Sequence, residues 1–151
     1  MTGPQNTINN LGSHIMNYGD YIYSPSFWAG GLIGLVIFVL YLVTLYGTLQ
    51  AVAPANRRME PGLVFLLLIP LFNLGWQFFV VIKLRDSLQA EYTARNLQGD
   101  GFGYGVGLAA GILYICSIIP LLGILAALAG FICWIIYWVK MAGYKNRLKA
   151  A

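Results

Sequence analysis

The longest uninterrupted apolar stretch of this chain runs from Gly101 to Val139, thirty-nine residues without one charged side chain. A helix needs about 20 apolar residues to cross about 30 Å of hydrocarbon. The run is therefore long enough for two crossings, and the helix-breaking Pro120 near its middle marks a tight turn between them. This pattern predicts helices at about 102–119 and 121–139.

Two earlier stretches, 28–50 and 62–82, are also uncharged and long enough to cross. We interpret Pro70, inside the second, as a kink. The fold class predicted is all-α: an integral membrane four-helix bundle with a tight hairpin of its third and fourth helices. The predicted divisions are a short polar and aromatic amino-terminal arm (1–27), a transmembrane domain (28–148) and a basic tail (140–151).

Composition supports a membrane protein. Hydrophobic residues make up 59% of the chain and charged residues 9%, against about 25% charged residues in a soluble domain. The residues outside the apolar stretches leave no room for a soluble catalytic domain. The net charge of +4 comes from basic residues that flank apolar segments, so it indicates orientation in the membrane and no nucleic-acid partner.

The arm lacks the pattern of a cleaved signal peptide. We expect 28–50 to act as an uncleaved signal anchor. Apolar residues from Ile8 to Ile22 fall at helical spacing, which suits a segment lying along the membrane interface. A disordered polar arm is the alternative, and the sequence leaves both open.

The distribution of basic residues predicts the orientation. Lys and Arg number none in the arm, two in the first loop, three in the second and four in the tail. Four crossings with the second loop and tail cytoplasmic place seven basic residues inside, which satisfies the positive-inside rule except at Arg57 and Arg58. If 62–82 were instead a re-entrant hairpin turning at 70–75, all nine would be inside. We favour the crossing, because backbone at membrane depth must be satisfied within protein.

Small residues recur every four positions in the last two predicted helices. Such faces let helix backbones approach closely. A short turn joins these helices, so we expect the small residues to pack the hairpin, with homodimerisation as the alternative. The residues are Gly103, Gly107 and Gly111, then Gly123 with Ala127 and Ala126 with Gly130.

Polar side chains at membrane depth are few. Asn73 and Gln77 are four apart and share a helix face. We expect them to hydrogen-bond between helices and fix the packing. The sharper alternative is a narrow polar pathway, although no charged residue lies at membrane depth to serve as a proton relay.

No catalytic or cofactor-binding constellation is evident. The single histidine, His14, lies in the arm, so no His-based metal site can form. Cys116 and Cys133 fall at different predicted depths, which argues against a disulfide. The five carboxylates lie in the arm and loops and indicate solvated charge. We therefore expect a non-enzymatic protein without a cofactor.

Aromatic and basic residues near helix ends are typical of membrane-interface anchors. Trp28 opens the first predicted helix, while Trp134 and Trp138 precede Lys140 at the end of the fourth. We assign these four residues to the interface.

Two stretches carry a resemblance. Ile69-Pro70-Leu71-Phe72-Asn73-Leu74-Gly75-Trp76 through Ser87-Leu88, and Cys133-Trp134-Ile135-Ile136-Tyr137-Trp138-Val139-Lys140 through Leu148, resemble small multi-pass bacterial inner-membrane proteins of unassigned function. The resemblance covers roughly 28–148. It implies a bacterial inner membrane and carries over no activity, ligand or functional residue.

These patterns together favour an accessory or assembly subunit, with lipid and other membrane subunits, or a second copy, as partners. One alternative is a small homo-oligomeric channel or transporter that uses Asn73 and Gln77. Another is a lipid-interacting protein that shapes membranes.

Overall fold

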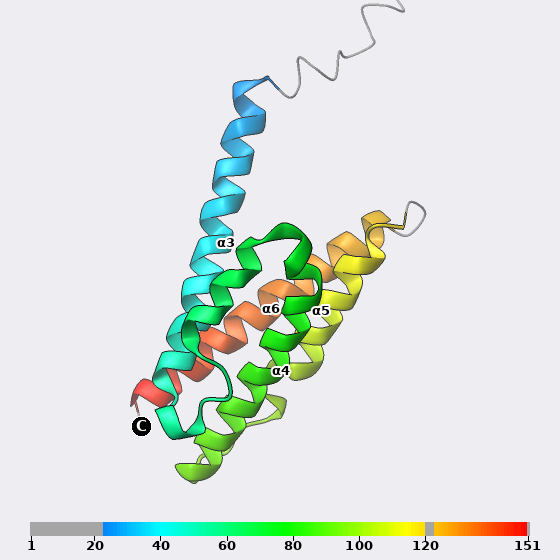
Figure 1. Ribbon diagram of the computed structural model, residues 1–151. Helices are drawn as coiled ribbons and strands as arrows, with labels where there is room; N and C mark the ends of the chain where they lie inside the picture. The colour runs from blue at the N-terminus through cyan, green and yellow to red at the C-terminus, as the bar shows by residue number, and fades with distance from the viewer. Residues whose placement is uncertain (1–22, 120–122, 151) are drawn as a thin grey trace, which may run out of the picture. The chain divides into compact units, whose positions relative to one another are not determined.

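The computed structural model describes residues 23–119 and 123–150 and places most of them in helices (Figure 1). Two helices, α3 and α6, are long and apolar enough to cross a membrane. No strand occurs in the part described. The elements are α3 (Pro25–Ala51), α4 (Pro70–Ala94), α5 (Tyr104–Cys116) and α6 (Gly123–Ala150), with 3-10 helices η1 (Pro54–Asn56), η2 (Pro61–Leu68) and η3 (Gly101–Gly103).

The chain divides into two compact units, Met1–Val39 and Leu40–Ala151. In the first unit the described residues form the beginning of α3, and their large apolar side chains are exposed, as at Trp28. The predicted interfacial segment of the arm lies outside the described residues. The second unit contains the end of α3 and every later element.

The core of the second unit follows the helical period. Side chains three and four residues apart lie on one helix face, so each helix buries a single stripe. The stripes are Tyr41, Leu42, Leu45 and Leu49 in α3, Val80, Val81, Leu84 and Leu88 in α4, and Tyr137, Met141, Tyr144 and Leu148 in α6.

The segment 62–82 is not the single kinked helix that we favoured. It forms η2 and the first half of α4, and the chain reverses between them at Ile69 and Pro70 (Figure 1). The indole Nε1 of Trp76 donates a hydrogen bond of 2.9 Å to the carbonyl oxygen of Leu63, thirteen residues earlier. The segment therefore folds as a helical hairpin, and its turn comes before the 70–75 of the alternative prediction.

Pro70 explains where the reversal falls. Proline disfavours helical dihedrals in the residue before it, and Ile69 is extended, with φ −84° and ψ 110°. Proline also suits the first turn of a helix, where no backbone N–H donor is needed. Pro70 therefore starts α4 and does not kink it.

The α5 and α6 helices form the second hairpin, and α6 is longer than predicted. It continues from Gly123 to Ala150, so the expected helix end at 139 and the separate tail at 140–151 are corrected. Burial of Met141 and Leu148 explains the extension, because the basic segment still has an apolar stripe to pack. The predicted turn residue Pro120 lies outside the described residues.

The predicted small residues occupy different surroundings. A Cβ atom at Gly107 would lie 2.8 Å from Tyr137 of α6 and from Val81 of α4, and one at Gly111 would lie 3.0 Å from Phe78 of α4. At Gly130 it would meet Leu113 of α5 at 3.2 Å. These glycines thus let α5 approach both α4 and α6.

The other small residues serve different positions. Gly103 precedes α5 with φ +71°, a conformation that glycine adopts without strain. A Cβ at Gly123 would lie 2.7 Å from the Ser117 carbonyl oxygen, whereas Ala127 is exposed. The Gly123 and Ala127 pair therefore forms no common packing face within the described chain.

The close approach at Gly107 predicts a sharp difference between two glycines of α5. Gly107→Ala should destabilise the protein by about 1–3 kcal/mol, because a well-packed core resists added methyl groups. Gly105→Ala is the matched control, since a Cβ there meets nothing within 4 Å, and it should be neutral or slightly stabilising. Thermal unfolding in mild detergent measures both; equal effects would contradict the packing.

Candidate functional site: a polar clasp at the basic end

A buried carboxylate joins several elements at the end of the second unit where α3, α4 and α6 terminate. The Glu91 side chain on α4 is 2% exposed. Its Oε2 accepts hydrogen bonds from the Ala53 backbone N–H at 2.9 Å and from Asn56 Nδ2 at 2.7 Å. Its Oε1 accepts one from Arg95 Nε at 2.7 Å. We call Asn56, Glu91 and Arg95 the polar clasp.

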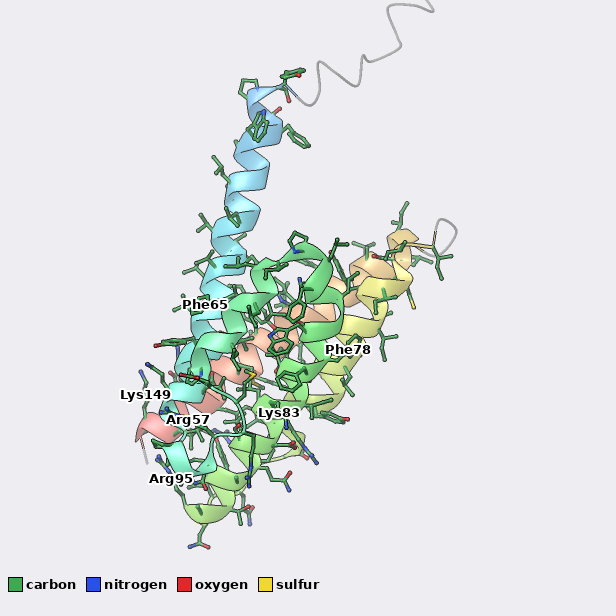
Figure 2. All side chains as sticks on the ribbon, viewed as in Figure 1. Arg57, Phe65, Phe78, Lys83, Arg95 and Lys149 are labelled. Atoms are coloured by element: carbon green, nitrogen blue, oxygen red, sulfur yellow. The ribbon has the colours of Figure 1, made fainter. Side chains whose placement is uncertain are left out.

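The clasp also reaches the last helix. Arg95 Nη1 donates to the carbonyl oxygen of Leu148 in α6 at 2.8 Å. The clasp therefore connects the loop after α3, the end of α4 and the end of α6. Figure 2 labels Arg57, Arg95 and Lys149, which come from these elements.

The clasp lowers the pKa of Glu91. Burial alone would raise it, but the hydrogen bonds from Asn56, Ala53 and Arg95 and the positive charge of Arg95 outweigh burial and hold the pKa below its ordinary value of 4.5. The carboxylate is thus ionised at neutral pH and fully paired.

Two neighbouring side chains fix the loop between α3 and η2. Arg57 Nε donates to the carbonyls of Leu49 and Val52, and its Nη2 donates to that of Gln50. Leu49 and Gln50 lie in the last turn of α3 and Val52 follows it, where backbone carbonyls run out of helical N–H donors, although Leu49 also accepts a bond of 3.2 Å from Val52 N–H. Arg57 therefore acts as a carboxyl-terminal cap of α3.

Ser87 of α4 holds the next residue of the same loop. Its hydroxyl accepts a hydrogen bond from the Arg58 backbone N–H at 2.9 Å and donates to the Lys83 carbonyl at 2.7 Å. The loop is thus attached to α4 at two points, Ser87 and Glu91.

The loop from Arg95 to Gly103 closes this end of the molecule. Backbone N–H groups of Asn96 and Leu97 donate to the carbonyls of Thr93 and Tyr92, the hydrogen-bond pattern of a Schellman cap. Asn96 has φ +54°, which asparagine tolerates better than most residues.

The glycines of this loop have a structural use. Phe102 is buried, with its ring 5.1 Å from that of Tyr92 and 5.4 Å from that of Tyr144. A side chain at Gly99 would collide with the Phe102 ring. The glycine spacing thus accommodates a buried aromatic ring.

The predicted intramembrane polar pair is split. Gln77 approaches the buried hydroxyl of Tyr41 on α3, and its Cγ would lie 3.6 Å from a Cβ at Gly111. Asn73 is half-buried near the start of α4. Gln77 thus lies where α3, α4 and α5 meet. Among the described residues, no contact of Asn73 with Tyr41 or Gly111 is seen.

Two predicted interface anchors have partners inside the protein. Trp134 packs against Tyr41, with ring centroids 5.0 Å apart, and Trp138 Nε1 donates to Thr44 Oγ1 at 2.9 Å. Both therefore join α6 to the second half of α3. Lys140 is exposed on α6, and Trp28 is exposed on the first part of α3.

The remaining chemical groups stay apart. Cys116 and Cys133 are free thiols, each half-buried. Within residues 23–119 and 123–150, no three His, Cys, Asp or Glu side chains gather as a metal site would require. His14 lies outside the described residues. The chain matches no protein-family model, no curated protein and no solved structure.

Sequence reasoning missed the clasp. It placed Glu91 among solvated loop charges, whereas α4 continues to Ala94 and buries it. The one available signal was the Glu91 to Arg95 spacing of four residues, which permits an ion pair on a helix. Nothing in the sequence indicated Asn56 or the Ala53 backbone as partners.

The clasp predicts acid sensitivity of folding. When folding lowers the pKa of a carboxyl group, its ionised form stabilises the folded protein at any pH above the pKa of the unfolded state. This stabilisation is lost as the pH falls through the lower pKa of the folded state. Stability should therefore decline below about pH 4.5, the ordinary value for this group. Thermal midpoints measured from pH 3 to 7 in detergent would show the decline, and Glu91→Gln should flatten it.

At neutral pH Glu91→Gln should cost about 3 kcal/mol, because it removes one partner of a buried ion pair. Asp86→Asn is the matched control. Asp86 pairs with Arg85 at 2.9 Å, but their side chains are 35% and 40% exposed, so its loss should cost less than about 1 kcal/mol. Equal losses would contradict the structural role of the clasp.

Proposed function

We propose that the chain is a non-enzymatic multi-pass protein of a bacterial inner membrane and serves as an accessory or assembly subunit of a larger membrane complex. The observation that carries this is how three buried polar and charged side chains are hydrogen-bonded. Thr48, Ser87 and Glu91 are buried and hydrogen-bond to the protein's own groups. Such groups fix helices in place and do not face a reaction site.

The outer surface supports contact with lipid and with other membrane subunits. Large apolar side chains are exposed along α5 and α6. Soluble monomers rarely expose contiguous apolar patches of more than a few hundred Å². Exposed examples are Ile112 and Tyr114 on α5, Ile118 just beyond its end, and Ile124, Leu125, Leu128, Phe131 and Ile132 on α6.

The hairpin supports one membrane orientation. The end of α3 and the end of α4 meet at the clasp, so 61–82 leaves and returns to the same end of the second unit. As a re-entrant hairpin it would leave both loops and the carboxyl terminus on one side. All nine basic residues would then be cytoplasmic, in agreement with the positive-inside rule.

The channel alternative draws less support. It relies on Asn73 and Gln77 lining one pathway, but Gln77 lies against Tyr41 and Gly111 at a helix junction. This surrounding suits interhelical packing, for which a polar contact in a membrane contributes about 0.6–2 kcal/mol.

Single-cysteine labelling tests the orientation. In a Cys116→Ala, Cys133→Ala background, an impermeant maleimide should label Ala55→Cys, Gln98→Cys and Lys149→Cys from the cytoplasmic side and Tyr23→Cys from the other. Four plain crossings would instead separate Ala55→Cys from the remaining three. That result would overturn the re-entrant orientation.

The native mass tests the subunit role. The protein, extracted from its own membrane in mild detergent, should migrate in a stable complex with other chains, identified by mass spectrometry. A discrete homo-oligomer with flux after reconstitution would contradict the proposal and favour the channel. Asn73→Ala with Gln77→Ala should then abolish flux without changing that mass.

A further inference from the structure

A pocket of mixed charge lies between the end of α3 and the start of η2. It is a wide, shallow depression with a volume of about 410 Å³, so a ligand seated there would keep much of its surface exposed. Two arginines and one glutamate are among its lining residues. The lining residues are Pro54, Arg57, Arg58, Met59, Glu60 and Pro61.

The walls of this pocket are held in place from outside it. Arg57 is oriented by its hydrogen bonds to the last carbonyls of α3. The Arg58 backbone is held by Ser87, and Asn56 is held by Glu91. The arginines thus project from a fixed loop, which lowers the ordering cost of binding a ligand.

The charges in the pocket do not neutralise one another. Arg58 and Glu60 are exposed, and across residues 23–119 and 123–150 the ion pairs are Arg85 with Asp86 and Arg95 with Glu91. Arg57 Nη1 makes no hydrogen bond to any described residue. Opposite charges that line one pocket unpaired suit a ligand that carries both signs.

The pocket also lies where polar chain meets apolar chain. Pro61 on its rim begins η2, whose Leu63, Phe65 and Leu68 are exposed. A ligand seated there has a charged site at one side and apolar side chains at the other. This is the arrangement that a phospholipid headgroup and its acyl chains require.

We propose that this pocket binds the phosphoethanolamine headgroup of a zwitterionic phospholipid. The planar guanidinium of Arg58 binds the phosphate with paired donors. Arg57, whose Nε and Nη2 are bonded to the end of α3, adds positive charge and its remaining Nη1 donors. Glu60 accepts hydrogen bonds from the primary ammonium. Phosphatidylglycerol offers no cation to Glu60, and phosphatidylcholine offers a cation without N–H donors. The inference rests on the proposed membrane location but not on the subunit role.

The test is a binding titration of the purified full-length protein by native mass spectrometry. The probes are dioctanoyl phosphatidylethanolamine, phosphatidylglycerol and phosphatidylcholine, and soluble phosphoethanolamine. The ethanolamine lipid should bind at least about tenfold more tightly than each of the others. Tighter or equal binding of phosphatidylglycerol would overturn the zwitterion site. If soluble phosphoethanolamine bound as tightly as the ethanolamine lipid, the proposal that the ligand is a lipid would be wrong.

Substitutions distinguish binding at this pocket from non-specific attraction of the lipid to basic residues. Arg58→Ala should weaken the ethanolamine lipid about tenfold, or about 1.4 kcal/mol, and Arg58→Lys should restore part of the loss. Glu60→Gln should erase the preference over phosphatidylglycerol. Lys149→Ala, which removes an exposed basic residue of α6, should change neither value, and a loss equal to that of Arg58→Ala would contradict the proposal.

Both pocket substitutions should leave the fold intact. The structural contact of Arg58 is its backbone N–H, which alanine retains, and Glu60 has no side-chain hydrogen bond to a described residue. Unchanged thermal midpoints would verify this. Reduced binding by folded Glu60→Gln alone, with phosphatidylglycerol unaffected, is the most specific support for an ammonium contact.

Discussion

Burial of the Glu91 carboxylate is the constraint on which the second unit depends. An ionised carboxylate leaves water at a large cost unless it is paired and hydrogen-bonded. Here its partners come from the loop after α3 and from α4 itself, while Arg95 extends the contact to α6. Satisfying one charge therefore holds the ends of three helices together.

The path of the intervening chain follows from this constraint. Because Ala53 and Glu91 meet, the apolar residues between them must depart from the clasp and come back to it. Pro70 supplies the reversal, and the Trp76 to Leu63 hydrogen bond joins the two arms of the hairpin. A polar interaction at one end thus determines the form of an apolar segment that contains none of its residues.

The sequence predicted the helical class and the bounds of α3 closely, because a long uncharged run has few other outcomes. It also predicted that α5 and α6 pair. It could not decide between a crossing and a hairpin at 62–82, since the number of apolar residues is the same for both. Burial of Glu91, and the internal partners of Trp134 and Trp138, arise from residues distant in sequence.

The arrangement of Arg57, Arg58 and Glu60 could not be predicted from the sequence either. The basic end was visible as a charge distribution, but the assignment of Arg57 to the α3 carbonyls depends on how the loop folds. The separation of Arg58 from Glu60 depends on the same fold. Oppositely charged residues two positions apart, such as Arg58 and Glu60, can pair or remain apart, and the loop geometry determines which occurs.

The 3-10 form of η2 affects how far its hairpin reaches. A 3-10 helix rises about 2.0 Å per residue, against about 1.5 Å for an α-helix. The eight residues of η2 therefore extend about 16 Å, a length that α4 needs about eleven residues to match. In the proposed orientation this is about half of a 30 Å hydrocarbon layer. The larger rise of the 3-10 helix thus lets eight residues reach the middle of the bilayer, from which α4 returns.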